Sequence, residues 1–178
     1  PHLSFYLDGT TALYNNMLLD VYSYWGNHEG WLFGEQMSDT QIIGGVCSNF
    51  TNAALSILPA AYGNHRISAG WTGQLSEYGI RSEKSFSINN CSIDQNDKHG
   101  IYLAASLGGG VGVIQCKIRA SSLAANNTYS HIYIGDSTKI RTAFNTFARG
   151  SANIAKYCIE YVTKATATYT SIGNDFSF

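Results

Sequence analysis

Short stretches in which apolar and polar side chains alternate recur along this chain, separated by corners rich in Asn, Asp, Gly and Ser. Residues 87–103 show the arrangement: an alternating stretch, a polar run, and a second alternating stretch that ends Gly-Ile-Tyr-Leu. Residues 112–135 repeat it. Alternation places one set of side chains inside and the other outside. The pattern therefore predicts β-strands, with helix at most a minor component.

Two columns of similar segments advance together, at intervals of roughly 20–30 residues. The first column comprises residues 88–93, 113–118, 142–147 and 171–176, and the second comprises 30–33, 54–57, 79–82, 100–103 and 131–134. This period, with at least two strands in each, is typical of a solenoid whose successive coils stack as parallel strands. Asn, Asp and Gly at the corners tolerate the left-handed conformations that sharp bends need.

Stacked coils would bring like residues together about 4.8 Å apart. We expect Cys91 over Cys116 and Asn145 over Asn174, with Cys158 near the second column. Cys47 precedes Cys91 by about two short coils, with Ala69 at the midpoint. The cysteines are accordingly interpreted as ladder residues rather than as disulfides or nucleophiles.

An antiparallel sandwich is the alternative fold. It would join its strands by Asn-Gly or Asp-Gly turns. Asp8-Gly9 is the only such dipeptide in the chain, so the solenoid is favoured.

Composition narrows the function classes. The chain has 178 residues, which fits one domain spanning 1–178, and its formal net charge of −1 gives no electrostatic argument for nucleic acid or an anionic membrane. No apolar run approaches the ~18 residues of a membrane span, and no CxxC pair indicates zinc, so we expect no membrane insertion, metal or cofactor. Charged residues make up only 13%, beside 12 Tyr and 18 Gly. Such a surface suits sugars, although it is also common in β-rich secreted or viral proteins.

Residues 88–103, 131–150 and 171–176 together resemble the right-handed parallel β-helix of the pectate-lyase-like superfamily, and within it the tailspikes of bacteriophages. The resemblance implies an all-β solenoid within a longer, homotrimeric protein of the virion (phage tail) or the extracellular space. It also implies that bacterial polysaccharide binds along the flank and that acidic residues catalyse. The arginine and calcium signatures of pectate lyases are missing. Because residues 3–7 read as another strand, we expect further coils before Pro1 or neighbouring subunits.

Carboxylates beside aromatic side chains mark the first candidate site. Glu29 and Glu35 flank a predicted strand, and we expect both to point outward beside Tyr24 and Trp25. Trp31 and Phe33 in that strand should point inward. Aromatic faces pack on pyranose rings, and a neighbouring carboxylate can bind hydroxyls or transfer a proton.

A carboxylate pair follows from the repeat. Aligning Gly30 with Gly79 places Glu77 level with His28, two coils away, so Glu29 and Glu77 fall near the upper end of the ~6.5–9.5 Å separation of inverting glycosidases. Asp39, in a polar turn expected beside the same patch, is a third carboxylate candidate. For each carboxylate the alternative is a solvated corner residue.

Further binding residues surround this pair. Lys98 aligns with His28 and Glu77 and would extend a sugar groove, unless its corner is a plain turn. Trp71 and Tyr78 flank Glu77 and offer a second stacking surface, although Trp71 could instead fill the core.

The functional hypothesis is a depolymerase segment that binds capsule or O-antigen polysaccharide and hydrolyses it by carboxylate acid/base catalysis. Two alternatives remain open. One is a receptor-binding module without catalysis, and the other is a polysaccharide lyase with a Tyr, His or Lys base acting on a uronate.

Overall fold

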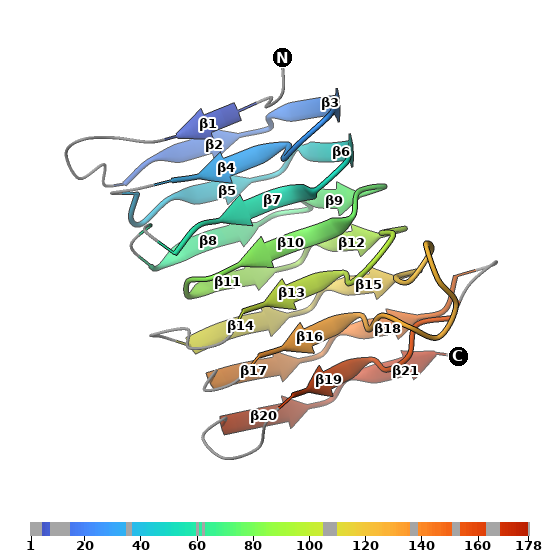
Figure 1. Cartoon of the computed structure of the whole chain (residues 1–178). Coiled ribbons are helices and arrows are strands. Elements are labelled where there is room, and N and C mark those ends of the chain that lie inside the picture. The colour runs from blue at the N-terminus through green and yellow to red at the C-terminus, as the bar shows by residue number, and fades with distance from the viewer. Residues whose placement is uncertain are drawn as a thin grey trace.

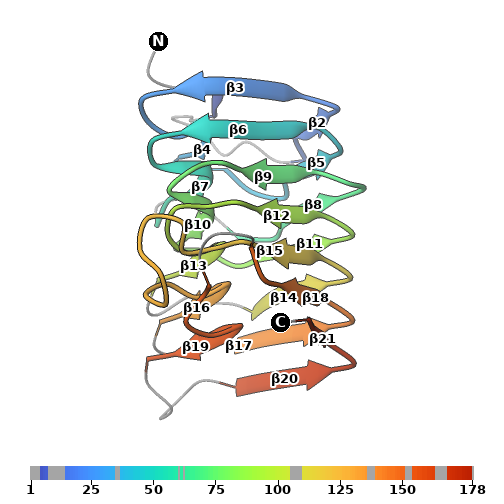
Figure 2. The same ribbon diagram turned by 90° about the vertical axis from the view of Figure 1, so that its right-hand side faces the viewer.

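The chain winds into a parallel β-helix. The computed structural model describes residues 5–7, 15–34, 37–59, 61, 63–104, 110–135, 139–150, 154–162 and 168–177. Within them, three sheets of seven strands run the length of the solenoid, and neighbouring strands pair in parallel (Figure 1, Figure 2). The predicted fold class, an all-β solenoid of parallel strands, is confirmed.

Each coil contributes one strand to each sheet. Sheet 1 contains β1 (Phe5–Leu7), β4 (Trp31–Phe33), β7 (Ala53–Ile57), β10 (Tyr78–Ser82), β13 (Ile101–Leu103), β16 (Ile132–Ile134) and β19 (Ile159–Tyr161). Sheet 2 contains β2 (Met17–Leu19), β5 (Gln41–Ile43), β8 (His65–Ser68), β11 (Phe86–Asn89), β14 (Gly110–Ile114), β17 (Lys139–Ala143) and β20 (Thr168–Ile172). Sheet 3 contains β3 (Tyr22–Gly26), β6 (Val46–Phe50), β9 (Thr72–Gln74), β12 (Ser92–Asp94), β15 (Lys117–Arg119), β18 (Thr146–Ala148) and β21 (Asp175–Ser177).

Inward-pointing side chains form a continuous apolar core. In sheet 1, residues in register across β4 to β16 are buried, in the order Trp31, Leu55, Ile80, Ile101 and Ile132. This is the second column that the sequence predicts, and β1 confirms the strand expected within residues 3–7.

Trp71 belongs to this core. Its ring is fully buried and lies 5.9 Å from the ring of Trp31, measured between centroids. Trp31 is held by a hydrogen bond of 2.8 Å from its Nε1–H to Ser23 Oγ. Trp71 therefore offers no surface for a sugar, and of its two predicted roles the core role is correct.

The corner between sheets 2 and 3 is a short bend in which the leading residue is left-handed. Asn90, Gln115 and Phe144 have φ of 53°, 53° and 54°, and Gly173 occupies the equivalent place with φ 59°. The next residue of each bend points inward, so Cys91 lies over Cys116 as predicted, because the flanking pairs Asn89–Ile114 and Ser92–Lys117 keep one register.

The asparagine ladder is confirmed as well. Asn145 is fully buried, and its Oδ1 accepts a hydrogen bond of 2.8 Å from the Cys116 backbone N–H. Its Nδ2 donates to the Val113 carbonyl at 2.8 Å and to Asn174 Oδ1 at 3.0 Å. One amide thus satisfies backbone groups that the bend leaves without strand partners.

Cys47 lies outside this ladder, which corrects the alignment with Ala69. The register pairs Cys47 with Gly73 inside sheet 3, and the ladder position of its coil is Gly45. Gly45 has φ 87°, and a side chain there would collide with the backbone of Val21.

All four cysteines are free thiols, and Cys158 directly precedes β19 in sheet 1, as predicted. Burial raises the pKa of the Cys91 thiol to about 12 and that of the Cys116 thiol to about 11. Thiols with raised pKa values are poor nucleophiles, so these cysteines act as packing residues. The described ranges contain no helix that is long and apolar enough to cross a membrane.

The buried imidazole of His131 should make stability depend on pH. His131 is 2% exposed, its Nδ1 lies 3.0 Å from Ser121 Oγ, and burial lowers its pKa from 6.5 to about 4. As pH falls below 6.5, His131 becomes protonated in the unfolded chain, whereas in the folded chain it stays neutral until about pH 4. We expect this histidine to cost about 2 kcal/mol of unfolding free energy between pH 7 and pH 5.

Urea unfolding of the wild type and of His131→Gln at both pH values measures this effect. The variant should lose less stability on acidification than the wild type. His28→Gln, at an exposed corner, is the matched control and should follow the wild type. Equal pH slopes for wild type and His131→Gln would contradict the assignment.

Candidate active site on sheet 1

The predicted alignment of charged residues is present at the 3–1 corner, which we define as the connection from a sheet 3 strand to the next sheet 1 strand. Backbone hydrogen bonds carry the strand register into this corner. They place four residues on successive coils, in the order His28, Asn52, Glu77 and Lys98. Glu29 and Glu77 therefore lie two coils apart, as predicted, with Asn52 on the coil between them.

Each of these carboxylates has a partner. Asn52 Nδ2 donates to Glu29 Oε1 at 3.3 Å, and Lys98 Nζ forms an ion pair with Glu77 Oε1. The same Lys98 Nζ lies 5.7 Å from the centroid of the Tyr78 ring. The hydrogen bond from Lys98 to Glu77 raises the pKa of the lysine. Lys98 thus neutralises one carboxylate and covers one aromatic face.

The other two carboxylate candidates do not join them. Asp39 precedes β5, at the corner where the chain passes from sheet 1 to sheet 2, and therefore lies at the opposite edge of sheet 1 from Glu29 and Glu77. The expectation that Asp39 lies beside their patch is wrong. Glu35 lies outside the described residues.

The predicted aromatic residues divide between two faces. Tyr24 and Trp25 are exposed at the end of β3 in sheet 3, just before the corner that carries His28 and Glu29, and Trp25 is 75% exposed. Tyr78 is half-buried in sheet 1 next to Glu77. Tyr24 and Trp25 can reach a ligand that extends from the 3–1 corner onto sheet 3, whereas Tyr78 serves sheet 1 itself.

Tyr78 belongs to a group of rings whose other four members the sequence analysis did not single out. We call it the tyrosine–histidine cluster, and its members are Tyr78, His99, Tyr102, Tyr129 and Tyr133. Tyr102 and Tyr133 are neighbours in register, with centroids 5.1 Å apart and planes only 7° apart. His99 lies at their edge, 4.7 Å from Tyr133 and 5.8 Å from Tyr102, and Tyr129 meets it edge-on at 5.2 Å.

His99 holds the cluster together. It is 7% exposed, and its Nδ1 accepts a hydrogen bond of 2.9 Å from the Ser130 backbone N–H. The Ser130 carbonyl oxygen lies 3.2 Å from the same nitrogen, but one nitrogen cannot accept and donate at once, so the shorter contact assigns the proton to Nε2. Burial lowers the pKa of His99. The ring is therefore neutral at neutral pH.

A second ion pair lies one coil beyond. Lys156 Nζ is 2.9 Å from Glu160 Oε1, and Ser130 Oγ donates to Glu160 Oε2 at 2.6 Å. Burial acts to raise the pKa of Glu160, but the hydrogen bonds from Ser130 and Lys156 lower it overall. Glu160 is thus charged, and its outward position in register with Tyr133 continues the line of Tyr102 and Tyr133.

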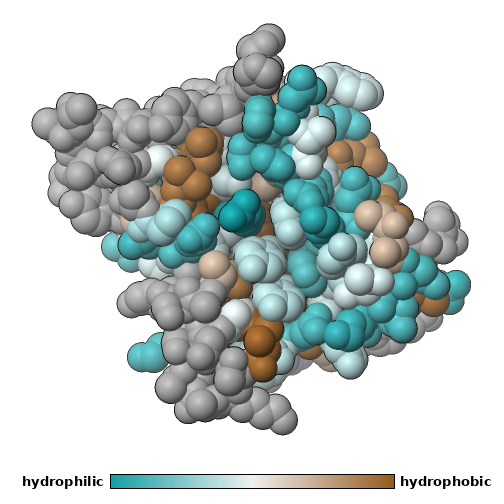
Figure 3. Space-filling view, viewed as in Figure 1, coloured by the Kyte–Doolittle hydropathy of each residue, from teal (hydrophilic) through white to brown (hydrophobic). Residues whose placement is uncertain are grey.

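The arrangement can bind a polymer more readily than it can make a tyrosinate base. Burial, Tyr102 and Glu160 all raise the pKa of Tyr133, and burial also raises that of Tyr78. Protonated phenols and ring faces suit the hydroxyls and the apolar faces of sugars. The sheet 1 side of the molecule is mostly hydrophilic, with isolated hydrophobic patches (Figure 3). Within the described ranges, no group of three or more His, Cys, Asp or Glu side chains could hold a metal ion.

Comparison with known proteins supports the fold. No family model and no curated protein matches the chain. Among solved structures, the A-module of the mannuronan C-5 epimerase AlgE4 from Azotobacter vinelandii matches with a TM-score of 0.62 and 12% sequence identity, over 92% of this chain. The chain spans 54% of that structure, about half its length. The fold is therefore shared with a polysaccharide-modifying β-helix enzyme.

Proposed function

We propose that this protein binds an extended polysaccharide across the outer face of sheet 1 and cleaves it at the 3–1 corner. The observation that supports the proposal is the stacked Tyr102–Tyr133 pair beside His99, which places partly exposed phenol rings on the flank between two ion pairs. Polysaccharides contact proteins through stacked rings and hydrogen bonds to hydroxyls, and this face supplies both. The fold of a polysaccharide-modifying enzyme supports the same substrate class.

Glycoside hydrolysis is the proposed reaction, with Glu29 as the acid and Glu77 as the base. Two coils separate them, which is about 10 Å between equivalent backbone positions, near the upper end of the inverting range. In the ion pair with Lys98, Glu77 is a carboxylate, the form that takes a proton from water. Glu29, which accepts a hydrogen bond from the neutral Asn52 amide, would donate its proton to the leaving oxygen. Water then adds to the anomeric carbon as the glycosidic bond breaks.

Elimination on a uronate is the second candidate, because the matched epimerase acts on mannuronan and because His99, which follows Lys98 in the chain, contacts Tyr102 and Tyr133. Two assays on a panel of bacterial capsule and O-antigen polysaccharides separate the reactions. Hydrolysis releases reducing ends without new ultraviolet absorbance, whereas elimination releases a reducing end on one fragment and leaves an absorbing unsaturated uronate at the non-reducing end of the other. Binding without new reducing ends would leave only the receptor-binding function.

The Tyr102–Tyr133 pair should carry much of the binding. We expect Tyr102→Ala combined with Tyr133→Ala to weaken the affinity for a cleavable oligosaccharide by about tenfold to 100-fold, since two partly exposed rings that would contact the sugar are lost. Isothermal titration calorimetry with the Glu77→Gln background, which prevents turnover, measures it. Tyr22→Ala, exposed at the far end of β3, should bind normally. Equal affinity in the double variant and the control would refute this binding site.

A phage tailspike is the proposed source of such a segment, with the virion tail or the extracellular space as its location and a homotrimer as its assembly. The proposal is supported by the sequence resemblance, by the low charge and by the tyrosine-rich surface. Tyr157 is exposed beside Lys156, where an adjacent β-helix could pack. Light scattering of the full-length protein tests the assembly: a mass of three chains supports it, and a monomer excludes it.

A further inference from the structure

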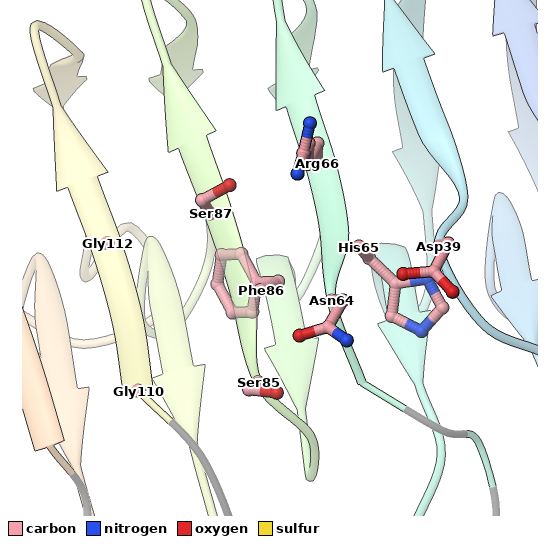
Figure 4. A pocket seen from close by; sticks show the side chains of 9 residues that line it. All are labelled: Asp39, Asn64, His65, Arg66, Ser85, Phe86, Ser87, Gly110 and Gly112. Atoms are coloured by element: carbon pink, nitrogen blue, oxygen red, sulfur yellow. The ribbon is translucent and has the colours of Figure 1, made fainter. Parts of the chain in front are cut away.

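A groove crosses the outer face of sheet 2, on a different side of the solenoid from the site proposed above. It has a volume of about 500 Å³ and is lined by residues of the corner before β5, of β8, of β11 and of β14. Figure 4 shows Arg66 and Ser87 on neighbouring strands, and β14 lines the groove with Gly110 and Gly112.

The two glycines create the hollow. A Cβ on Gly112 would meet only Ser87 Cβ at 3.7 Å, and a Cβ on Gly110 would meet only the Lys139 carbonyl at 3.7 Å. Neither glycine is therefore required by close packing or by a positive φ, and each leaves open space above β14. A second hollow of about 190 Å³ shares Gly110 and continues over β17 to Thr170. The groove thus runs across several coils, along the solenoid axis.

Cations line this groove. Arg66 lines the first hollow, Lys139 and Arg141 line the second, and all three are exposed. The described residues offer none of the three an ion-pair partner. The acidic lining residue is Asp39, at one end, whose Oδ2 accepts a hydrogen bond of 2.8 Å from Ser38 Oγ. The groove is therefore positive along most of its length.

The spacing of the two arginines defines the ligand. Register places Arg66, Ser87, Gly112 and Arg141 on four successive strands. Arg66 and Arg141 are thus three strand spacings apart, roughly 14 Å at about 4.8 Å per spacing. One small anion cannot contact both. An extended polymer with an acid group on successive units can, with Ser87 and the bare backbone of Gly112 between the two charges.

We propose that this sheet 2 groove binds the carboxylate groups of an acidic polysaccharide. Guanidinium groups bind carboxylates through two parallel hydrogen bonds, and Ser85, Ser87 and Asn64 supply hydroxyl and amide partners for the sugar. The groove holds the polymer without cleaving it. The idea that one polysaccharide occupies both sheet 1 and sheet 2 rests on the function proposed for sheet 1. Binding in the sheet 2 groove does not depend on that function.

Titration of the Tyr102→Ala/Tyr133→Ala variant with six-unit oligomers tests the proposal, since it removes the stacking pair of sheet 1. The probes are oligomannuronate, oligogalacturonate and neutral mannohexaose. At least one acidic oligomer should bind, mannohexaose should bind at least tenfold more weakly, and added salt should weaken the acidic complex. Adding Arg66→Gln and Arg141→Gln should cost roughly another tenfold in affinity.

Two further variants locate the effect. Gly112→Leu adds a side chain over the groove floor without changing charge, and it should weaken the acidic complex as well. Lys117→Gln, an exposed cation on sheet 3, should leave it unchanged. Failure of both acidic oligomers to bind, equal binding of mannohexaose, tighter binding of a DNA duplex, or unchanged affinity after Arg66→Gln and Arg141→Gln would overturn the proposal. Cleavage on sheet 1 is assayed separately, so either proposal can fail alone.

Discussion

Glu77→Gln should lower the rate of polysaccharide cleavage by about 100-fold or more, because a neutral amide cannot accept the proton of the attacking water. The ion pair that Lys98 forms with Glu77 is the structural basis of this expectation. The loss should fall on kcat, with KM changed little, since the tyrosine–histidine cluster remains to bind substrate. Reducing-end release under saturating and limiting polysaccharide separates the two parameters.

Two other carboxylates serve as comparisons. Glu83→Gln removes a surface partner of Arg81, 3.7 Å away, and should leave cleavage unchanged. Glu29→Gln should be as impaired as Glu77→Gln if the two act as acid and base. Normal kcat in Glu77→Gln would remove this residue from the mechanism and favour the elimination chemistry of the second candidate.

Gly79→Ala should destabilise the fold by about 3 kcal/mol, the upper end of the usual cost of overpacking a rigid interior. A Cβ on Gly79 would lie 2.5 Å from Ile93 Cγ2, 2.7 Å from the Gly100 carbonyl oxygen and 3.0 Å from Asn96 Nδ2. The Gly100 oxygen belongs to the next coil and cannot move without breaking strand pairing. The free energy of unfolding in urea measures the loss.

Gly112→Ala is the matched control, because its Cβ would make only an ordinary contact of 3.7 Å with Ser87 Cβ. Its stability should stay within about 1 kcal/mol of the wild type, since alanine also restricts the unfolded chain. If both alanine variants were equally stable, the close approach of coils at Gly79 would be wrong.

The coil register could be predicted because the repeat carries it. The alternation around Trp31, Leu55, Ile80, Ile101 and Ile132 fixes which side chains point inward, and a shift by one residue would expose them all. Cys91, Cys116, Asn145 and Asn174 were aligned correctly for the same reason. The alignment failed at Cys47, where its coil uses Gly45 at the ladder position because the bend leaves no space for a side chain.

Only part of the candidate site could be predicted from the sequence. Glu29, Glu77 and Lys98 could be placed because they lie next to strands with a clear register. The cluster around His99 was missed, since two of its contacts, Tyr129 and Ser130, lie in the long connection 120–131, which no repeat constrains. One signal was present: Tyr102 and Tyr133 occupy the same outward place in Gly-Ile-Tyr-Leu and His-Ile-Tyr-Ile.

Asp39 and Trp71 show a further limit. Asp39 is close to Glu29 in the chain, but sheet 1 separates them, because distance along one coil is unrelated to which edge a residue occupies. Trp71 lies near Glu77 in sequence, but its large apolar ring is buried in the core, because burial removes more apolar surface from water than an exposed position would.

The bends from sheet 2 to sheet 3 stay short from one coil to the next. The 3–1 corners vary in length, from residues 51–52 to residues 120–131. Insertions on that edge therefore leave the stacking of the coils undisturbed. Evolution can lengthen or rewrite these loops independently of the scaffold, and they lie beside the proposed polysaccharide site. Relatives of this protein should accordingly differ chiefly in the loops of this edge, while the bends between sheets 2 and 3 keep a common length.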